Sequence, residues 1–386
     1  MPRHRSAASR RKFLELTGMG VIWAGLPSPS AETAVASNGL VFLPVGPLAA
    51  ARTNPSLPVY IDSNENPHGP SEKAIMAMKN SFSLAGRYVH NPFELQRALC
   101  QHHQVGSSMI EIGYGSSEIL KMAVEAFLGP GKNVVVGQPT YEAIPRYGAV
   151  YNAETIRVPL SSQHRHDLKR MRAAVNDKTG LVYICNPNNP TATVVSGNEM
   201  ADFLTSMPTN VPVLIDEAYY HYADDPSYVS SIPFAAAGKA VVVTRTFSKI
   251  YGMAGLRLGY AVGREDLIGR MSPFKIWLNM NALTVAAGLA SLDDKEFVGR
   301  NQKLNAQTRR FVEEQVAGLG LKCIPSQANF LMIDLRREVF PVLNALRARS
   351  VFVGRVFAPL TTHMRVTIGT EEEMKRFVEE LKHVLP

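Results

Sequence analysis

Hydrophobic residues follow two patterns, short apolar runs and longer segments with helical spacing, which alternate from about residue 71 onward. The segment 117–128 has helical spacing, because Leu120, Val124 and Phe127 fall on one helix face together with Ala123. The short runs are often β-branched and apolar at successive positions, as in strands covered on both sides. This alternation predicts an α/β fold with a mainly parallel sheet. The runs are residues 133–136, 155–158, 181–185, 211–215, 240–244 and 258–262.

The pattern changes after about residue 300. We predict a long polar helix over 301–319, strands over 329–334 and 364–368, and a final amphipathic helix over 371–385. These elements indicate a smaller α+β domain. The expected parts of the chain are an N-terminal signal (1–36), an extended arm (37–70), a large domain (71–290) and a small domain that includes part of the arm (291–386).

The first 36 residues have the order of an export signal. Arg10 and Arg11 precede a Phe-Leu pair, a weakly polar stretch at 16–26 and a small-x-small sequence at 34–36. The stretch is too short to span a bilayer as a helix. This order resembles a twin-arginine (Tat) signal peptide, which is an address read by a receptor and not an anchor. We therefore expect export by the Tat route, a periplasmic or secreted location, and no stable membrane anchor.

Composition narrows the function classes. The 386 residues are 46% hydrophobic and 19% charged, which is typical of a chain that folds as a globule. The formal net charge is +8, but the bases form no run or stripe, and a site for small anions explains this charge as well as nucleic-acid binding would. We expect no nucleic-acid partner. Cys100, Cys185 and Cys323 lie far apart without metal-ligand spacing, so we expect no disulfide framework and no metal site.

Lys249 is the first candidate for chemistry. It follows an apolar run and stands among small and hydroxyl residues, in the sequence Thr-Phe-Ser-Lys-Ile-Tyr-Gly-Met-Ala-Gly-Leu-Arg of residues 246–257. Partial burial there would lower the pKa of the amine and free its lone pair for imine formation. For an isolated Ser-Lys pair the alternative is a solvated surface lysine, but the neighbouring residues favour the chemical interpretation.

The sequence around Lys249 resembles the Schiff-base motif of class I/II aminotransferases, and most closely that of the histidinol-phosphate aminotransferase group. The resemblance implies that Lys249 carries pyridoxal 5'-phosphate (PLP) covalently. It also implies that Thr246, Ser248 and Arg257 bind the cofactor phosphate. An arginine suits this task because it offers a permanent charge and a bidentate fork.

Asp216 and Tyr219 form a second candidate pair, directly after the apolar run 211–215. Asp216 would end a buried strand, where ligand-binding groups are expected in an open α/β sheet. A buried carboxylate there would stabilise the protonated pyridine nitrogen of PLP. By the resemblance, Tyr219 contacts the phenolate oxygen of the cofactor. Taken alone, Asp-x-x-Tyr after a strand also fits a simple helix cap.

A third motif, Asn-Pro-Asn-Asn-Pro-Thr-Ala at residues 186–192, resembles the family's Asn-Pro-x-Asn-Pro-Thr-Gly loop. The resemblance assigns Asn189 to the same phenolate oxygen. Ala192 replaces the usual glycine, so a positive φ at this position would strain the backbone, or the loop would form a different turn. A plain turn of proline and asparagine is the alternative interpretation.

Two further motifs complete the expected cofactor site. Gly115, Ser116 and Ser117 open a predicted helix, whose N-terminus offers N–H groups and a positive dipole to a phosphate. They resemble the family's Gly-Ser/Ala-Asp-Glu motif, with Ser117 in place of the aspartate, although an ordinary capped helix would look the same. Tyr141 ends a Pro-Thr-Tyr sequence similar to the family's Pro-x-Tyr, which implies that its ring stacks on the pyridine ring.

The resemblance also indicates residues for the substrate and for a second subunit. Arg365, in Arg-Val-Thr-Ile-Gly-Thr, matches the arginine that binds the substrate carboxylate, and Arg355 matches a second arginine for an anionic end. Asn64 lies in Asn-Glu-Asn-Pro-His-Gly-Pro, which the family places near the active-site entrance. Tyr88 matches a tyrosine that reaches the neighbouring subunit's phosphate, although Val89 follows it here in place of proline. Tyr88 therefore implies a homodimer.

Over residues 60–386, the resemblance implies a fold-type-I PLP-dependent transferase with a mainly parallel seven-stranded sheet in the large domain. Lys249, Asp216 and Tyr219 would be the catalytic residues of an aminotransferase. Its substrates would be an L-amino acid, of histidinol-phosphate or aromatic type, and a 2-oxo acid such as 2-oxoglutarate. Export argues against histidinol phosphate, because histidine synthesis uses cytoplasmic intermediates. The alternatives are a PLP-dependent decarboxylase or oxidase of amino acids and a non-catalytic binding protein on this fold.

Overall fold

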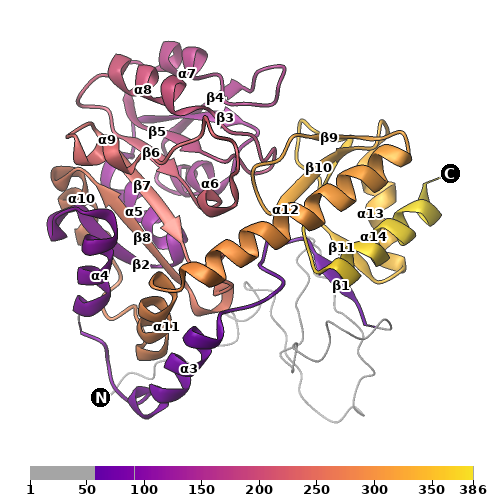
Figure 1. Ribbon diagram of the computed structural model, residues 1–386. Coiled ribbons are helices and arrows are strands. Elements are labelled where there is room, and N and C mark those ends of the chain that lie inside the picture. The colour runs from indigo at the N-terminus through magenta and orange to yellow at the C-terminus, as the bar shows by residue number, and fades with distance from the viewer. Residues whose placement is uncertain (1–56, 91, 386) are drawn as a thin grey trace, which may run out of the picture. The chain divides into compact units, whose positions relative to one another are not determined.

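A seven-stranded mixed sheet forms the centre of the structure, a computed structural model that describes residues 57–90 and 92–385 (Figure 1). Strand β8 is antiparallel to both of its neighbours, and the other neighbouring pairs are parallel. The predicted α/β class with a mainly parallel sheet is confirmed. In spatial order the strands are β2 (Ile110–Tyr114), β8 (Leu258–Gly263), β7 (Val241–Thr246), β6 (Val213–Asp216), β5 (Thr179–Cys185), β3 (Asn133–Gln138) and β4 (Glu154–Pro159).

Each of the six predicted apolar runs forms one of these strands, with ends that differ by a few residues. Strand β6 begins at Val213 because Pro212 before it has no N–H for a sheet hydrogen bond. Strand β2 was not predicted, since it is an edge strand that includes Glu111 and Gly113 and has no apolar run. Its C-terminal end leads directly into the helix that the sequence had placed at 117–128.

Helices cover both faces of the sheet, and alternate residues of a strand belong to different cores. On β7, Val241 and Val243 pack in one apolar cluster and Val242 in the other. The first face is covered by α4 (Phe93–His103), α7 (Leu168–Ala174), α8 (Gly197–Ser206), α9 (Ile232–Ala236) and α11 (Ala282–Leu292), with α3 (Glu72–Asn80) against α11. The second face is covered by α5 (Gly115–Phe127), α6 (Ala143–Val150) and α10 (Glu265–Met271).

A separate apolar cluster is formed by the last third of the chain together with the first described strand. Strand β1 (Val59–Ile61) pairs with β11 (Val351–Val353), so the N-terminal arm contributes to the C-terminal part. The other elements here are β9 (Lys322–Ile324), β10 (Phe330–Asp334), β12 (His363–Thr367), α12 (Lys295–Gly318), α13 (Val339–Ala348) and α14 (Glu371–Val384). Short 3₁₀ helices are η1 (Phe82–Leu84), η2 (Ser107–Met109), η3 (Tyr220–Tyr222), η4 (Ala254–Leu256) and η5 (Ser272–Phe274).

The largest difference from the predicted helix ends is at α12, which begins at Lys295, ahead of the predicted residue 301. Helix α5 begins at Gly115, where the glycine–serine motif was expected to open it. Residue 290 lies inside α11, so the exact division between large and small domain stays a prediction. The predicted signal at 1–36, and the arm up to residue 56, lie outside the described residues. Within the described ranges, none of the helices has the length and apolar character needed to span a bilayer.

Candidate active site

Lys249 lies just beyond the end of β7, close to the chain that precedes α3. Its Nζ donates hydrogen bonds to the backbone oxygens of Ser63 (3.2 Å) and Asn64 (2.9 Å). Burial, and after it the nearby charge of Arg365, lower the pKa of Lys249 to about 8. A larger fraction of this amine is therefore neutral at physiological pH than for an ordinary lysine, which is the condition for nucleophilic attack on a carbonyl.

Asp216 occupies the last position of the neighbouring strand β6 and is 3% exposed. Tyr183 on β5 donates its hydroxyl to Oδ2 (3.0 Å), and the N–H of Ala218 donates to Oδ1 (3.1 Å). Burial raises the pKa of Asp216 to about 6, although both hydrogen bonds favour the ionised form. A cation beside this carboxylate would remove most of the cost of its charge. Sequence analysis did not identify Tyr183, and the available signal was one tyrosine in an otherwise apolar strand.

Tyr219 lies between the segments that carry Asn64 and Asn189. Its hydroxyl oxygen accepts hydrogen bonds from Nδ2 of Asn64 (3.0 Å) and from Nδ2 of Asn189 (3.4 Å). Arg365 on β12 donates from Nη1 to Oδ1 of Asn189 (2.9 Å). The structure thus brings together Asn64, Asn189, Tyr219 and Arg365, which come from four distant segments. Asn64 is further held by Thr367, whose hydroxyl donates to its Oδ1 (3.1 Å).

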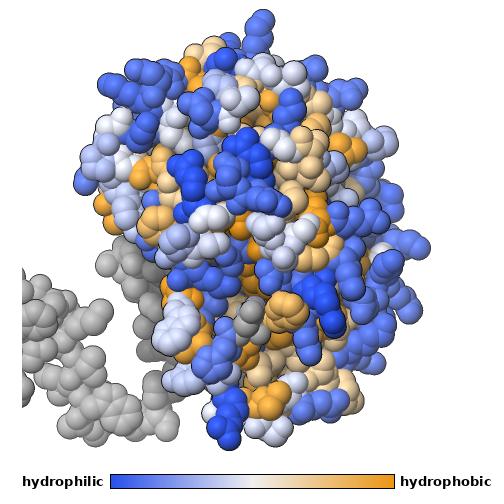
Figure 2. Space-filling model, turned by 90° about the vertical axis from the view of Figure 1, so that its left-hand side faces the viewer, coloured by the Kyte–Doolittle hydropathy of each residue, from blue (hydrophilic) through white to orange (hydrophobic). Residues whose placement is uncertain are grey.

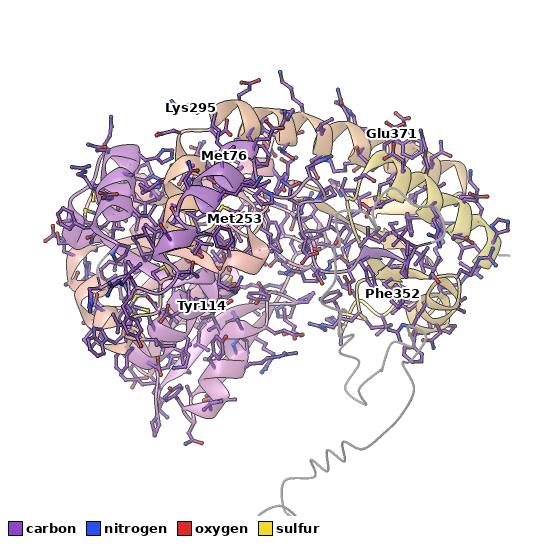
Figure 3. All side chains as sticks on the ribbon, turned by 90° about the horizontal axis from the view of Figure 1, so that it is seen from below. Met76, Tyr114, Met253, Lys295, Phe352 and Glu371 are labelled. Carbon is purple, nitrogen blue, oxygen red and sulfur yellow. The ribbon has the colours of Figure 1, made fainter. Side chains whose placement is uncertain are left out.

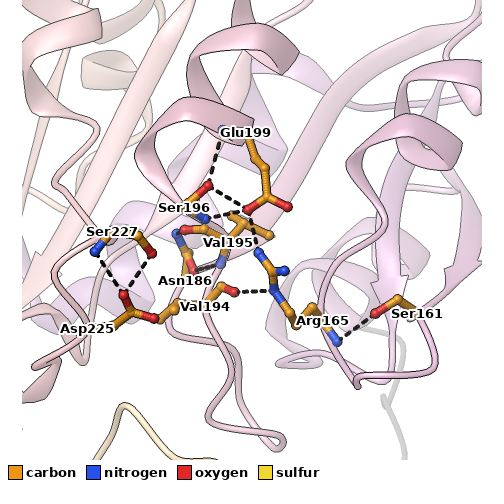
Figure 4. A network of polar contacts seen from close by, with 9 residues as sticks. All are labelled: Ser161, Arg165, Asn186, Val194, Val195, Ser196, Glu199, Asp225 and Ser227. Carbon is orange, nitrogen blue, oxygen red and sulfur yellow. Dashed lines mark hydrogen bonds and ion pairs between the residues drawn. The ribbon is translucent and has the colours of Figure 1, made fainter.

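The loop that carries Asn189 is closed at its base by side chains (Figure 4). Asn186 accepts a hydrogen bond from the N–H of Val195 (3.0 Å) and donates to its carbonyl (3.3 Å). Arg165 donates from Nε to the carbonyl of Val194 (2.7 Å). The loop is therefore held by contacts at both ends, which position Asn189.

Ala192 in this loop has a φ of +61° and is fully buried. Its N–H donates to the carbonyl of Asn188 (2.7 Å), and its carbonyl accepts from Gln327 (2.8 Å). Alanine at this position thus adopts the positive φ whose strain the sequence analysis considered. The alanine keeps the left-handed conformation, which costs about 1–2 kcal/mol for a residue with a Cβ atom.

Residues expected to bind a phosphate meet where β7 ends and α5 begins. The hydroxyl of Thr246 donates to Oγ of Ser248 (2.9 Å), and Arg257 donates from Nη1 to the same Oγ (3.3 Å). The N–H of Gly115 donates to the carbonyl of Arg257 (2.9 Å). A Cβ atom on Gly115 would lie only 2.4 Å from Nη2 of Arg257, so glycine is required for this approach.

Ser116 and Ser117 follow Gly115 in the first turn of α5. The first N–H groups of a helix have no partner inside the helix, and they carry the positive end of its dipole. Here they lie beside the guanidinium of Arg257. The result is a concave site with backbone donors, hydroxyls and a fixed positive charge, which is suited to a phosphate dianion.

The next part of the candidate site contains Tyr141 and the two arginines expected to bind the substrate, Arg355 and Arg365. Burial raises the pKa of Tyr141, and the charge of Asp216 raises it further, which places the tyrosine near that carboxylate. Arg355 and Arg365 both face the ring of Phe357, at 4.2 Å and 4.6 Å from its centroid.

Arg355 also forms an ion pair of 2.8 Å with Glu142, the residue after Tyr141. Sequence analysis did not identify Glu142 as a site residue. The Nε of Arg365 is buried and has no hydrogen-bond partner among the described residues, which leaves a donor for a ligand. Burial lowers the pKa of Arg365 to about 10, so it remains positively charged at neutral pH.

Tyr88 is the one predicted site residue that the structure does not bring to the others within the described part of the chain. It is 74% exposed, and its ring lies edge-on to His90. This exposure agrees with a role toward another molecule, but no contact of that kind is part of the structure.

Apart from Tyr88, the predicted site residues have the chemistry needed to bind PLP. The start of α5 lies close to the guanidinium of Arg257, Asp216 is a buried carboxylate whose pKa is raised to about 6, and Lys249 presents a partly neutral amine. Fold and site together define an α/β enzyme that binds a phosphorylated aldehyde and reacts through an imine.

Comparison with known proteins identifies the family. The model of "Aminotransferase class I and II" matches residues 59–381, and the chain belongs to this family. It is 37% identical over 331 residues to the histidinol-phosphate aminotransferase of Moorella thermoacetica, with 85% of each chain covered. It is 38% identical over 329 residues to histidinol-phosphate aminotransferase 1 of Nitrosococcus oceani, covering 85% of this chain and 89% of the relative.

A solved structure supports the same assignment. The histidinol-phosphate aminotransferase of Sinorhizobium meliloti, in complex with pyridoxal-5'-phosphate, superposes with a TM-score of 0.81 at 26% identity, covering 89% of this chain and 95% of that one. The protein is therefore an aminotransferase with PLP as its cofactor, as the sequence predicted.

Proposed function

We propose that this enzyme transfers the amino group of an L-amino compound of histidinol-phosphate or aromatic type to a 2-oxo acid such as 2-oxoglutarate. The observation that carries this proposal is the pair of arginines around Phe357. Arg365 is buried and has an unpartnered Nε, whereas Arg355 is half exposed at the edge of the site. One arginine would bind the carboxylate common to amino and oxo acids, and the other would bind a second anionic group.

The reaction follows from the positions of the chain's own groups. When bound, PLP supplies an electron sink for the charge that develops on the substrate's α-carbon. Nζ of Lys249 takes the proton from that carbon as a general base and returns a proton as a general acid. Asp216 stabilises a positive charge at the end of β6, and Tyr219 and Asn189 orient an oxygen acceptor between them.

The choice between the two substrate types depends on Arg355. The names of the relatives support a phosphorylated substrate, whose dianion would replace Glu142 as the partner of this arginine. The ring of Phe357 and the half-exposed ring of Tyr141 support an aromatic side chain in the same place. Export, if it occurs, would separate the enzyme from cytoplasmic histidine synthesis and would favour an aromatic amino acid.

A half-reaction screen tests the proposal. Holoenzyme is mixed with one amino compound at a time, and the cofactor absorbance is followed. We expect conversion with histidinol phosphate or with phenylalanine, tyrosine or histidine, return of the spectrum on adding 2-oxoglutarate, and no conversion in Lys249→Ala. Turnover without a 2-oxo acid would show a decarboxylase or oxidase instead.

A second measurement separates the substrates. In Arg355→Gln, kcat/KM for histidinol phosphate should fall about tenfold or more, since a hydrogen bond to a charged group contributes about 1.5–3 kcal/mol. For phenylalanine the value should stay within about threefold, because its side chain has no charge to lose. Equal losses for both would contradict this role of Arg355.

We also propose a homodimer, supported by exposed apolar side chains near Tyr88. Met76, Phe82, Leu84 and Phe93 are 50–62% exposed and belong to α3, η1 and α4, at the lower left of Figure 1. Figure 2 shows hydrophobic side chains exposed among hydrophilic ones on the face that corresponds to this side. A patch of this kind favours burial against another protein surface.

We finally propose that residues 1–36 direct export by the Tat route, on the strength of their sequence alone. Fusion of these residues to a reporter that folds in the cytoplasm tests it. The fusion should appear in the periplasm of a Tat-competent host and remain in the cytoplasm when Arg10 and Arg11 are both replaced by lysine. Equal distribution of the two fusions would reject the proposal.

A further inference from the structure

A cavity of about 500 Å³ opens between the end of α4, η3, α9 and the first turns of α12. None of the predicted active-site residues lines it. The two sites are separated by the alternation of strand β7, because Thr246 points to the phosphate-binding region while Arg245 points to the opposite face and into this cavity.

The polar wall of the cavity contains bases and no acids. His102 and His103 come from α4, His221 from η3, Arg245 from β7, and Lys295 from the start of α12, where Figure 3 labels it. Neither aspartate nor glutamate is among the lining residues in the described part of the chain. The described lining therefore presents imidazole nitrogens and the ammonium group of Lys295, and it contains no carboxylate.

The carboxylate that balances Arg245 lies behind it. Glu217 accepts from Nε (3.0 Å) and Nη2 (2.8 Å) of Arg245, and both side chains are at most 5% exposed. The same carboxylate accepts from the N–H of Ser231 (2.5 Å) and the hydroxyl of Ser230 (2.8 Å). Glu217 is thus fully occupied and cannot turn to neutralise the cavity.

The imidazoles respond to this environment. Burial lowers the pKa of His103 and of His221 to about 3, and the charge of Arg245 is the next cause in both. Burial and then Arg245 also lower the pKa of His102. All three rings are neutral at pH 7, so they offer hydrogen-bonding nitrogens to an occupant and add no charge of their own.

The cavity also has apolar lining residues. They are Ile232 and Pro233 of α9, Leu292 of α11 and Val298 of α12. The volume falls within the range of about 300–1,000 Å³ that is typical of small-molecule sites. An occupant that matches both kinds of lining has one anionic group and a hydrocarbon or aromatic body.

We propose that this cavity binds a small organic carboxylate with an apolar body. Its carboxylate lies among the imidazoles of His102, His103 and His221 and near Lys295, and its body packs on Ile232 and Leu292. The site is separate from the PLP site. The two sites are joined by adjacent residues. Asp216 belongs to the PLP site, and the next residue, Glu217, binds Arg245 of the cavity.

Gly299 allows the cavity to be filled without disturbing the fold. It lines the cavity from α12, and a Cβ atom built on it meets no other atom within 4 Å. Gly318 lies in the same helix with equally open surroundings and is not among the lining residues. Leucine at either position should also favour the helix, because glycine is about 0.8–1 kcal/mol less favourable in a helix interior than the best helix former.

The test measures binding of phenylacetate to the holoenzyme by titration calorimetry, with cofactor absorbance recorded in parallel. We expect binding to the wild type with a Kd near or below about 1 mM, binding to Gly318→Leu of equal strength, and a loss of at least about tenfold in Gly299→Leu. Lys295→Gln should weaken binding by about threefold or more, and benzyl alcohol, which lacks the anion, should bind at least about tenfold more weakly.

The cofactor absorbance distinguishes this cavity from the PLP site, because an acid that enters the active site changes the spectrum in all three proteins. No binding by the wild type would overturn the proposal. Equal binding by Gly299→Leu and Gly318→Leu would place the ligand elsewhere and would overturn it as well. Equal binding of benzyl alcohol would remove the role of the anion.

Discussion

Burial shifts the pKa values of single residues in the candidate site toward the neutral pH range. Lys249 has its pKa lowered to about 8, and Asp216 has its pKa raised to about 6. These shifts have opposite directions because desolvation disfavours the charged form of both groups. A bound cofactor with a cationic ring nitrogen would stabilise the carboxylate, so the unliganded protein carries a cost at Asp216 that the cofactor removes.

The first prediction concerns this cost in the cofactor-free protein. A carboxyl group whose pKa is raised on folding binds more protons in the folded state, so its contribution to stability decreases as pH rises from about 4 through about 6. The free energy of unfolding of the wild type, relative to Asp216→Asn, should therefore fall by about 3 kcal/mol between pH 3.5 and pH 7.5. Urea unfolding at both pH values measures it, and a difference independent of pH would refute the raised pKa.

The second prediction concerns Ala192. Glycine there would relieve about 1–2 kcal/mol of left-handed strain. It would also remove a buried methyl group, at about 0.8 kcal/mol, and add about 0.5–1 kcal/mol of backbone entropy in the unfolded state. These effects nearly cancel, so Ala192→Gly should change the free energy of unfolding by less than about 1 kcal/mol, which explains why alanine is tolerated.

Valine is the contrasting variant at residue 192. A β-branched residue is a genuine outlier at positive φ, and the buried site has no space for two more methyl groups, so Ala192→Val should lose about 3 kcal/mol or more. Chemical unfolding of the three proteins gives the comparison. Equal stability of the valine and alanine forms would mean that residue 192 does not hold a φ near +61°.

At the scale of elements, the phosphate-binding site depends on how closely α5 approaches β8. A Cβ atom on Gly259 of β8 would lie 2.2 Å from the backbone nitrogen of Ser116 and 2.6 Å from the carbonyl carbon of Gly115. No side chain fits there without moving the first turn of the helix. The helix N-terminus is placed by this contact between backbones.

The third prediction follows from that approach. Gly259→Ala should displace the start of α5 and weaken PLP binding by about tenfold or more, since the phosphate contacts depend on position. Gly269→Ala in α10 is the matched control, because a Cβ there meets nothing within 4 Å and alanine favours the helix. Cofactor titration of the two apoproteins measures it. Equal affinities would show that the approach of α5 to β8 does not set the phosphate site.

The strands also show which elements the apolar pattern of the sequence can predict. Of the six runs that became β3 to β8, all except the edge strand β4 are buried on both faces, so their sequences are apolar at successive positions. Strands β2, β9 and β11 were not predicted, because they are short and include exposed or polar positions such as Glu111 and Lys322. Short strands obtain their stability from neighbouring chain segments, which a local pattern does not contain.

For the whole molecule, the fourth prediction concerns the proposed dimer. Met76→Glu combined with Leu84→Glu places charges on two exposed apolar positions, at 55% and 50% exposure, and should convert the enzyme to monomers with weakened cofactor binding. Phe340→Glu on α13, also exposed, is the control and should leave the mass unchanged. Sedimentation velocity measures both.

Tyr88→Phe refines this test, because it should keep the dimer and weaken PLP binding by about threefold or more through loss of one hydroxyl contact. Wild-type affinity in that variant would remove Tyr88 from the proposed cofactor site. A monomeric wild type would reject the dimer itself.

The sequence by itself determined the class of fold, the cofactor and most residues that surround it. Apolar runs and helical spacing are local properties, and the motifs around Lys249, Asp216 and Asn189 place reactive groups at strand ends, where such folds bind ligands. The tertiary structure alone decided which groups meet. It brought Tyr183 to Asp216, Asn64 to Tyr219 and Glu142 to Arg355, and it formed the basic cavity around Arg245. These pairings join segments far apart in the chain, and their distances depend on packing of the whole fold, which no local pattern records.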